Sequence, residues 1–169
     1  MRRKLMKALL LILLCVVVAP MLLSCGSHEN QSADAAAEVS VAALDKALAE
    51  RAGGPLLDGM GDYQMSITTQ DPNAQRYFNQ GMVLAFAFNH AESIRSFRAA
   101  QTLDATCAMC FWGEALATGP NINITSKGEV IMAPADRESA FAALQKAIAL
   151  KANASAKEQA YIDAFSCSL

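Results

Sequence analysis

The chain has 169 residues, and its 14 lysines and arginines against 16 aspartates and glutamates give a formal net charge of −2. A chain of this length forms one small domain at most, and an acidic balance without a basic cluster argues against a nucleic-acid partner. The hydrophobic fraction of 53% overstates the core, because an apolar N-terminal segment and many alanines contribute to it.

The first 24 residues have the pattern of a secretory signal peptide. An apolar run over 8–23 follows four basic residues, which are Arg2, Arg3, Lys4 and Lys7. The run is 16 residues long and contains Pro20, whereas a membrane-spanning helix needs about 18 or more apolar residues, so we interpret it as a cleaved signal. Its end, Leu22-Leu23-Ser24-Cys25, resembles the lipobox of bacterial lipoproteins. That resemblance implies cleavage before Cys25 and attachment of a lipid to Cys25.

The same resemblance implies a location. Gly26 follows Cys25, in place of the aspartate that commonly retains bacterial lipoproteins in the inner membrane. We therefore expect a lipid anchor in the outer membrane, with the protein on the periplasmic side of the cell envelope. Cleavage removes four of the 14 basic residues, which leaves 10 against 16 acidic residues and a net charge of −6.

The next segments are predicted to connect the lipid to a helical domain. Residues 25–36 are polar and without periodicity, which indicates a flexible tether. Residues 37–54 predict an N-terminal helix with a narrow apolar stripe of Val41, Leu44 and Leu48. Residues 55–73 predict an irregular linker. Asp71-Pro72 near its end predicts the start of a helix, because aspartate caps free amides and proline suits the first helical position.

Residues 74–107 have the spacing of a helix-pair repeat of about 34 residues. Three residues share one face of a first helix, and three share one face of a second: Tyr77, Gly81 and Leu84, then Ser93, Phe97 and Ala100. Gly81 and Ser93 are small where the helices approach, and Phe97 fills the space beside them. We predict that Tyr77, Gly81, Leu84, Phe97, Ala100 and Leu103 are buried together.

A second repeat is predicted over 108–154 and an incomplete third over 155–169. The second helix of the second repeat matches only at an offset of 47 residues, with Ala140 in the place of Ser93, so we expect an inserted loop over 119–133. Ser155 and Glu158 form a capping box that opens the third unit. Because stacked repeats need neighbours and a polar cap, we expect the chain to be an N-terminal fragment of a longer protein.

The repeat spacing resembles the tetratricopeptide repeat (TPR). The resemblance implies an all-α fold of antiparallel helix pairs, a short α-solenoid that presents a binding surface. It points to a binding protein and not to an enzyme.

Cys107-Ala108-Met109-Cys110, at the start of a helix, allows four interpretations. Covalent haem needs a histidine directly after the second cysteine, and Phe111 stands there, so we exclude it. A redox-active pair lacks the strand–helix context of a thioredoxin-like fold. A metal site would need His90 as a third ligand. We favour a disulfide, or two buried thiols, that fixes the joint between repeats, since disulfides persist after export. Cys167 is left over.

Five residues are candidates for ligand binding: Asn89, His90, Trp112, Asn121 and Asn123. A histidine at the turn between helices typically hydrogen-bonds a free carbonyl at a helix end, and the functional alternative is a ligand carboxylate or a metal. Residues 119–123 form a rigid corner of Gly, Pro, Asn, Ile and Asn that either satisfies its own backbone or lines a ligand site. The aromatic residues of this region are predicted to lie in the core, and these are Phe86, Phe88, Phe97 and Trp112.

No catalytic motif is present in the sequence. It lacks a Ser-His-Asp arrangement, an HExxH motif and a phosphate-binding glycine loop. It has two histidines, one of them in the predicted tether, which leaves little for acid–base chemistry. We predict no enzymatic activity, no cofactor and no bound metal.

Four motifs together resemble one family of exported bacterial TPR lipoproteins. They are Phe88-Asn89-His90, Cys107-Ala108-Met109-Cys110, Trp112-Gly113 and Gly119-Pro120-Asn121-Ile122-Asn123, in that order and spacing. The resemblance covers about residues 63–165, and the family's members are typically several times longer. It implies the TPR-like fold and no particular activity. Our first hypothesis is a lipid-anchored periplasmic scaffold that binds a protein or peptide. The alternative is a thiol- or metal-dependent protein, redox-active or metal-binding, that uses Cys107, Cys110 and His90.

Overall fold

The computed structural model describes residues 43–120, 125–126, 129–130 and 132–167. Two compact units divide the chain, Met1–Leu44 and Asp45–Leu169, and the second unit contains nearly all of the described residues. The helices are an N-terminal one over 43–52, then α3 (Pro72–Phe86), α4 (His90–Leu103), α5 (Ala108–Thr118), α6 (Pro134–Leu150), the short 3-10 helix η2 (Lys151–Asn153) and α7 (Ala156–Ser166). The prediction of an all-α fold is confirmed.

Two strands of two residues each interrupt the helical order between α5 and α6. They are β1 (Thr125–Ser126) and β2 (Glu129–Val130), and they pair antiparallel. They lie inside the segment expected as an inserted loop, and α6 begins directly after that segment. No pattern in the sequence predicted this short hairpin.

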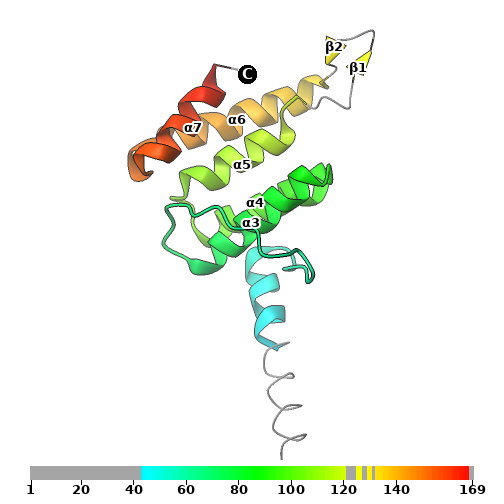
Figure 1. Ribbon diagram of the computed structural model, residues 1–169, viewed down its shortest axis with the longest axis vertical. Coiled ribbons are helices and arrows are strands. Elements are labelled where there is room, and N and C mark those ends of the chain that lie inside the picture. Colours follow the sequence, from blue (N-terminus) through cyan, green and yellow to red (C-terminus); the bar gives the residue numbers. More distant parts are fainter. Residues whose placement is uncertain (1–42, 121–124, 127–128, 131, 168–169) are drawn as a thin grey trace, which may run out of the picture. The chain divides into compact units, whose positions relative to one another are not determined.

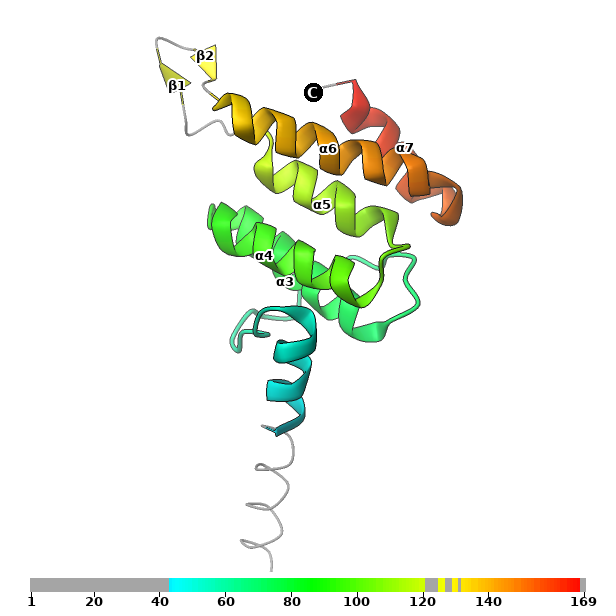
Figure 2. The same ribbon diagram turned by 180° about the vertical axis from the view of Figure 1, so that it is seen from behind.

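Consecutive helices pack against one another. α3 and α4 lie side by side, α5 packs between that pair and α6, and α7 packs against α6 (Figures 1 and 2). The connection of α3 to α4 is only the short turn Ala87–Asn89, so these helices run antiparallel. α3 also contacts α5, and α5 also contacts α7.

The helices begin where their capping residues predict. Asp71 accepts a hydrogen bond from the Asn73 N–H at 2.8 Å, and Pro72 occupies the first turn of α3. Arg51 of the N-terminal helix forms an ion pair with Asp71 at 3.1 Å. Ser155 and Glu158 form the predicted capping box at the start of α7. The prediction of these two helix starts is therefore confirmed.

Phe97 is the centre of the core. Its ring is fully buried between two glycines on different helices, Gly81 on α3 and Gly113 on α5. A Cβ atom at Gly81 would lie 2.7 Å from the Phe97 ring, and one at Gly113 would lie 2.3 Å from it. The Ser93 hydroxyl donates to the Gly81 carbonyl at 2.7 Å, and this hydrogen bond links α4 to α3 where the two helices are close together. Small residues therefore let three helices meet on one aromatic ring.

The predicted buried set is confirmed, with Leu103 partly buried and packed against the same core. Gly113 was not part of that set, although it is as tightly packed as Gly81. The prediction that all four aromatic residues lie in the core is wrong for two of them. Phe97 and Trp112 are buried, whereas Phe86 and Phe88 are 60% and 59% exposed. Both lie where α3 ends, and there the chain turns outward before α4.

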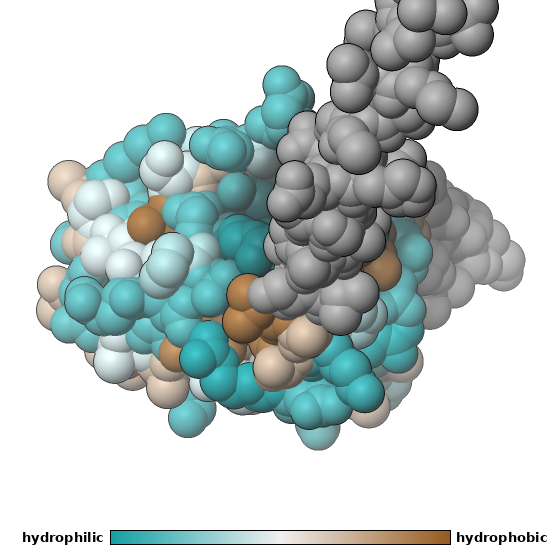
Figure 3. Space-filling view, turned by 90° about the horizontal axis from the view of Figure 1, so that it is seen from below, coloured by the Kyte–Doolittle hydropathy of each residue, from teal (hydrophilic) through white to brown (hydrophobic). Residues whose placement is uncertain are grey.

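The surface is largely polar, with isolated apolar patches. Figure 3 shows one face of the molecule, on which hydrophilic residues predominate and hydrophobic residues gather in a small central patch. Across the described residues, the large apolar side chains that remain exposed are Leu44, Leu57, Tyr63, Phe86, Phe88, Phe141 and Tyr161. Two of them, Phe86 and Phe88, are close together in sequence.

Candidate functional site

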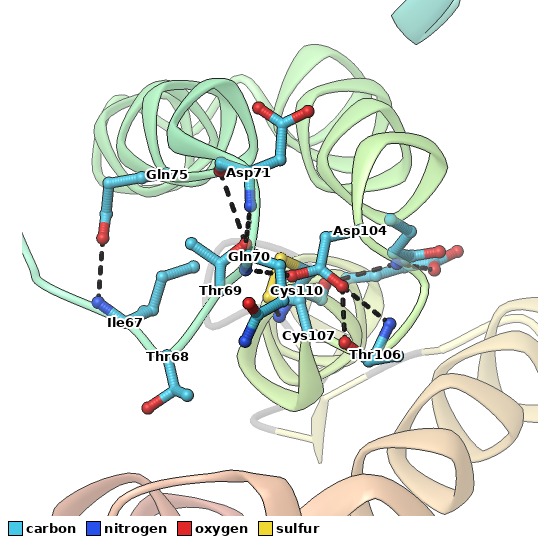
Figure 4. The surroundings of a disulfide bond; sticks show 12 residues. Ile67, Thr68, Thr69, Gln70, Asp71, Gln75, Asp104, Thr106, Cys107 and Cys110 are labelled. Carbon is cyan, nitrogen blue, oxygen red and sulfur yellow. Dashed lines mark hydrogen bonds between the residues drawn. A yellow bond between two sulfur atoms is a disulfide. The ribbon is translucent and has the colours of Figure 1, made fainter.

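The structure joins Cys107 and Cys110 in a disulfide at the first turn of α5 (Figure 4). Their Cα atoms lie 5.4 Å apart, within the range that a disulfide requires. Both cysteines are buried, and the Cys107 sulfur also accepts from the Cys110 N–H at 3.2 Å as the helix cap. Because thiol–disulfide exchange needs access for an attacking thiolate, this geometry suits a structural joint better than a redox centre.

Asp104 lies beside the disulfide and accepts four hydrogen bonds. Thr69 Oγ1 and the Gln70 N–H donate to one carboxylate oxygen at 2.6 and 2.7 Å, and the Thr106 hydroxyl and N–H donate to the other at 2.6 and 2.9 Å (Figure 4). Burial alone would raise the pKa of this carboxyl. The donors from Thr106, Thr69 and Gln70 outweigh burial and lower the pKa of Asp104 to about 2. A charged aspartate therefore ties the 104–107 turn to the linker.

Glu158 does the same for α7. One carboxylate oxygen accepts from the Thr68 N–H at 2.6 Å, and the other accepts from the Thr68 hydroxyl at 2.6 Å and the Ser155 N–H at 2.7 Å. Burial raises the pKa of Glu158, but the hydrogen bonds from Ser155 and Thr68 outweigh it, and the pKa lies below its ordinary value. Glu158 thus caps its own helix and holds the linker at once.

Amide side chains of α3 hold the rest of the linker. Gln75 accepts from the Ile67 N–H at 2.9 Å and donates to the Met65 carbonyl at 2.9 Å. Asn79 accepts from the Met65 N–H at 3.3 Å. Farther along α3, Gln80 bonds to the Leu57 N–H and the Pro55 carbonyl, at 2.7 and 3.1 Å. All of these bonds reach main-chain atoms, so the helices hold a segment that has no helix or strand of its own.

The turn between α3 and α4 presents the exposed aromatic rings. The Asn89 N–H donates to the Leu84 carbonyl at 2.9 Å and the Phe88 N–H to the Ala85 carbonyl at 3.0 Å, which is the Schellman pattern of helix termination. Phe88 occupies its left-handed position with φ of 60°. Glycine is usual there, and a side chain with a Cβ atom costs about 1–2 kcal/mol.

Phe88 gains little packing in return for this strained backbone, because its ring is 59% exposed and lies against the His90 ring, with centroids 6.3 Å apart. Phe86 packs edge-on against Tyr63 of the linker, with ring centroids 5.6 Å apart, and Tyr63 is itself 37% exposed. We call Tyr63, Phe86 and Phe88 the aromatic turn patch. A strained backbone that displays a ring to solvent indicates a role in contact with another molecule.

His90 lies at the far end of α5 from the cysteines. Its Nδ1 is 3.1 Å from the Ala117 carbonyl, which belongs to the last turn of α5. The disulfide lies at the first turn, and a helix of 11 residues is about 16 Å long. The structure therefore does not bring His90 to Cys107 and Cys110. Within the described ranges, no three metal-ligating side chains are grouped together.

Of the other residues predicted to bind a ligand, Asn89 caps a helix and Trp112 packs in the core. The rest lie outside the described residues. Asn89 caps α4, accepting from the Glu92 N–H at 3.4 Å. Trp112 packs against Tyr161 and Phe165 of α7, with ring centroids 5.7 and 6.3 Å away. Its buried Nε1 has no hydrogen-bond partner in the described part of the chain. Three predicted residues lie outside the described residues: Cys25, Asn121 and Asn123.

The residues that hold the linker were not predicted from the sequence. Asp104 and Gln80 carried no prediction, and Glu158 was recognised only as a capping residue. The signal that was available is the spacing of Gln75 and Asn79, which places two amides on one face of α3 beside an apolar linker. A linker with apolar residues such as Met65 and Ile67 is expected to pack against the helices.

Comparison with protein-family models, with curated proteins and with solved structures found no match for this chain. None of the helices in the described ranges has the length and apolar character that crossing a membrane requires.

Proposed function

We propose that this chain is a lipid-anchored, TPR-like helical scaffold that binds a protein or peptide partner in the periplasm. The order of packing supports the repeat arrangement. α3 pairs with α4 and α5 with α6, and the first helix of each pair also contacts the first helix of the next unit, α3 with α5 and α5 with α7. Helix-pair repeats stack in this manner and bind partners on the surface that stacking creates.

The observation that carries the proposal is the aromatic turn patch. Phe88 is held in a backbone conformation that glycine would adopt at lower cost, and its ring contributes little to the core. Aromatic residues, phenylalanine included, are enriched at the centre of protein interfaces relative to the rest of the surface. We infer that the partner contributes apolar or aromatic side chains to this patch.

The linker contacts supply a second argument. Gln75, Asn79 and Gln80 bind main-chain atoms of a segment that has no regular structure. The scaffold therefore has the chemistry to hold an unpaired peptide segment. That surface is occupied by the chain itself, which favours the aromatic turn patch as the place where a partner docks.

A selection from a library of random displayed peptides tests the binding function. The full chain in detergent micelles serves as bait. We expect enriched peptides with apolar and aromatic residues, and we expect Phe88→Gly to weaken their binding about tenfold or more. Phe141→Ala is the matched control, because Phe141 is an exposed aromatic residue of α6 outside the patch. Equal binding to the Phe88→Gly variant, or no enrichment over empty micelles, would contradict the proposal.

The lipid anchor is tested separately. We expect Cys25→Ala to leave the chain unprocessed in a bacterial host, whereas the unchanged chain is cleaved before Cys25 and lipid-modified. Mass spectrometry of the membrane fraction distinguishes these products. An unmodified Cys25 at the start of the mature membrane-associated protein would overturn the anchor. The thiol- or metal-dependent alternative has no observation in its favour, because the cysteines are bonded and buried and His90 lies at the other end of α5.

A further inference from the structure

A cavity of about 330 Å³ opens between the linker, the 104–107 turn and η2. Its lining is made of three hydroxyl and two amide side chains, and these are Thr68, Thr69, Gln70, Thr106 and Asn153. The elements come from distant parts of the sequence, so the fold builds this cavity and no short motif encodes it.

Each hydroxyl group that lines the cavity already donates its proton in a hydrogen bond within the protein. Thr68 donates to Glu158, and Thr69 and Thr106 donate to Asp104, each at 2.6 Å. A hydroxyl has one proton and two lone pairs, so these oxygens can only accept hydrogen bonds from a molecule in the cavity. The side-chain amides of Gln70 and Asn153 each add a carbonyl oxygen as an acceptor, beside an NH2 group.

Two buried carboxylates stand directly behind the hydroxyl groups. Asp104 and Glu158 are both buried, and neither is in an ion pair with a cation among the described residues. The N-terminus of α7 offsets part of the Glu158 charge, because Glu158 lies in its first turn. The remaining negative potential, together with the hydroxyl and amide oxygens that can accept, favours a cation that carries several N–H donors.

We propose that this cavity is a binding site for an alkylammonium group. Its three N–H groups would donate hydrogen bonds to hydroxyl and amide oxygens of the lining, which belong to Thr68, Thr106, Gln70 and Asn153. An ammonium group has three donors and no acceptor, which matches the accepting hydroxyl and amide oxygens of this lining. The group could belong to a free amine or to a lysine side chain of a partner. The site is independent of the aromatic turn patch and of the proposed binding function.

Amide chemical shifts of the full chain in detergent micelles, followed during titration with n-butylammonium chloride, test the site. We expect saturable shifts at Thr68, Gln70, Thr106 and Asn153. Neutral 1-butanol and anionic butyrate are the matched probes, and we expect neither to produce saturable shifts at these residues. Equal saturation by 1-butanol would overturn the proposal, as would shifts that grow linearly without saturation.

Substitutions at Asn153 make the test specific, because this residue is exposed on η2 and its replacement leaves the core intact. Asn153→Lys places a tethered ammonium in the cavity, and we expect it to weaken n-butylammonium binding about tenfold. Asn153→Asp should strengthen binding, and Phe141→Ala, at an exposed position of α6 that does not line the cavity, is the control. Unchanged affinity in both the lysine and the aspartate variants would overturn the site.

A final titration compares the two sources of the ligand. Nα-acetyl-lysine N-methylamide carries the same ammonium group on a peptide unit. Binding at least as tight as that of n-butylammonium assigns the site to lysine side chains. Tighter binding of the free amine assigns it to small amines. Failure of both to bind would overturn the proposal, while leaving the peptide selection at the aromatic turn patch unaffected.

Discussion

The two turns that flank α4 differ in how far their residues are exposed and in how they are bonded to the rest of the fold. The turn before it, Ala87–Asn89, exposes the ring of Phe88 and holds that residue in a conformation that glycine would suit better. The turn after it, 104–107, has its two end residues, Asp104 and Cys107, buried and bonded to other parts of the fold. Its aspartate accepts four hydrogen bonds, and its cysteine is crosslinked to the first turn of α5.

This difference indicates a division of roles within a single hairpin of helices. The turn after α4 stabilises the joint between helix pairs, and its buried aspartate and cysteine are both bonded. The turn before α4 is less stable than it could be, because a phenylalanine at a left-handed position strains the backbone and this one is mostly exposed. Residues that cost stability without contributing to the core are expected at binding surfaces.

Phe97→Ala tests whether both turns depend on one core. The ring lies between Gly81 and Gly113 and is fully buried, so its loss should lower the free energy of unfolding by about 3–5 kcal/mol. Urea unfolding followed by circular dichroism measures the change. Phe141→Ala, at an exposed position of α6, is the control and should change stability by less than about 0.5 kcal/mol. A loss below about 1 kcal/mol for Phe97→Ala would show that the turns are held independently.

Asp104→Asn tests the bonded turn. The pKa of Asp104 is lowered from 3.8 to about 2, so its charge contributes about 2 kcal/mol of stability above pH 4, which disappears as the pH falls towards 2. We expect the variant to be less stable than the unchanged chain at pH 7, and the gap to close near pH 2. Denaturant unfolding across this pH range measures it. Asp163→Asn, at an exposed ion pair, is the control. A gap of the same size at both pH values would contradict the electrostatic explanation.

Replacement of both Cys107 and Cys110 by alanine should have a smaller effect. The disulfide closes a loop of only a few residues, so the chain-entropy model gives about 1–2 kcal/mol. We expect the double variant to fold and to melt at a lower temperature. Cys167→Ala is the control, because Cys167 is exposed and not part of this disulfide. A double variant that does not fold would give the disulfide a larger role than joint geometry.

Phe88→Gly should have the smallest effect and the opposite sign. Glycine relieves the left-handed strain, and little packing is lost, so we expect stability to rise by about 1 kcal/mol. Phe88→Ala removes the ring but keeps a Cβ atom and should show no such gain. Thermal melting of the two variants side by side measures the difference. A loss of stability in Phe88→Gly would mean that the ring packs against the fold.

The sequence was sufficient to predict the parts of the fold that follow local rules. Periodicity predicted the face that carries Tyr77, Gly81 and Phe97, and capping chemistry predicted the starts of α3 and α7. Such features depend on residues within one or two turns of each other.

The candidate sites depend on contacts that no local pattern contains. Thr68 and Glu158 are 90 residues apart in sequence, and Thr69 and Asp104 are 35 apart. The prediction that Phe86 and Phe88 lie in the core was wrong because apolar residues at the end of a helix were assigned to its buried face. The Schellman turn changes the direction of the chain there, and periodicity does not detect that change.

The linker is held mainly through its backbone, and this has a consequence for how its sequence can change. The partners of Gln75, Asn79 and Gln80 are N–H and carbonyl groups, which every residue except proline supplies in full. Exposed linker positions such as Gln64 and Ser66 are therefore open to neutral drift between related chains. The same property makes them suitable places to graft a foreign epitope, which the helices would display in a fixed register along α3.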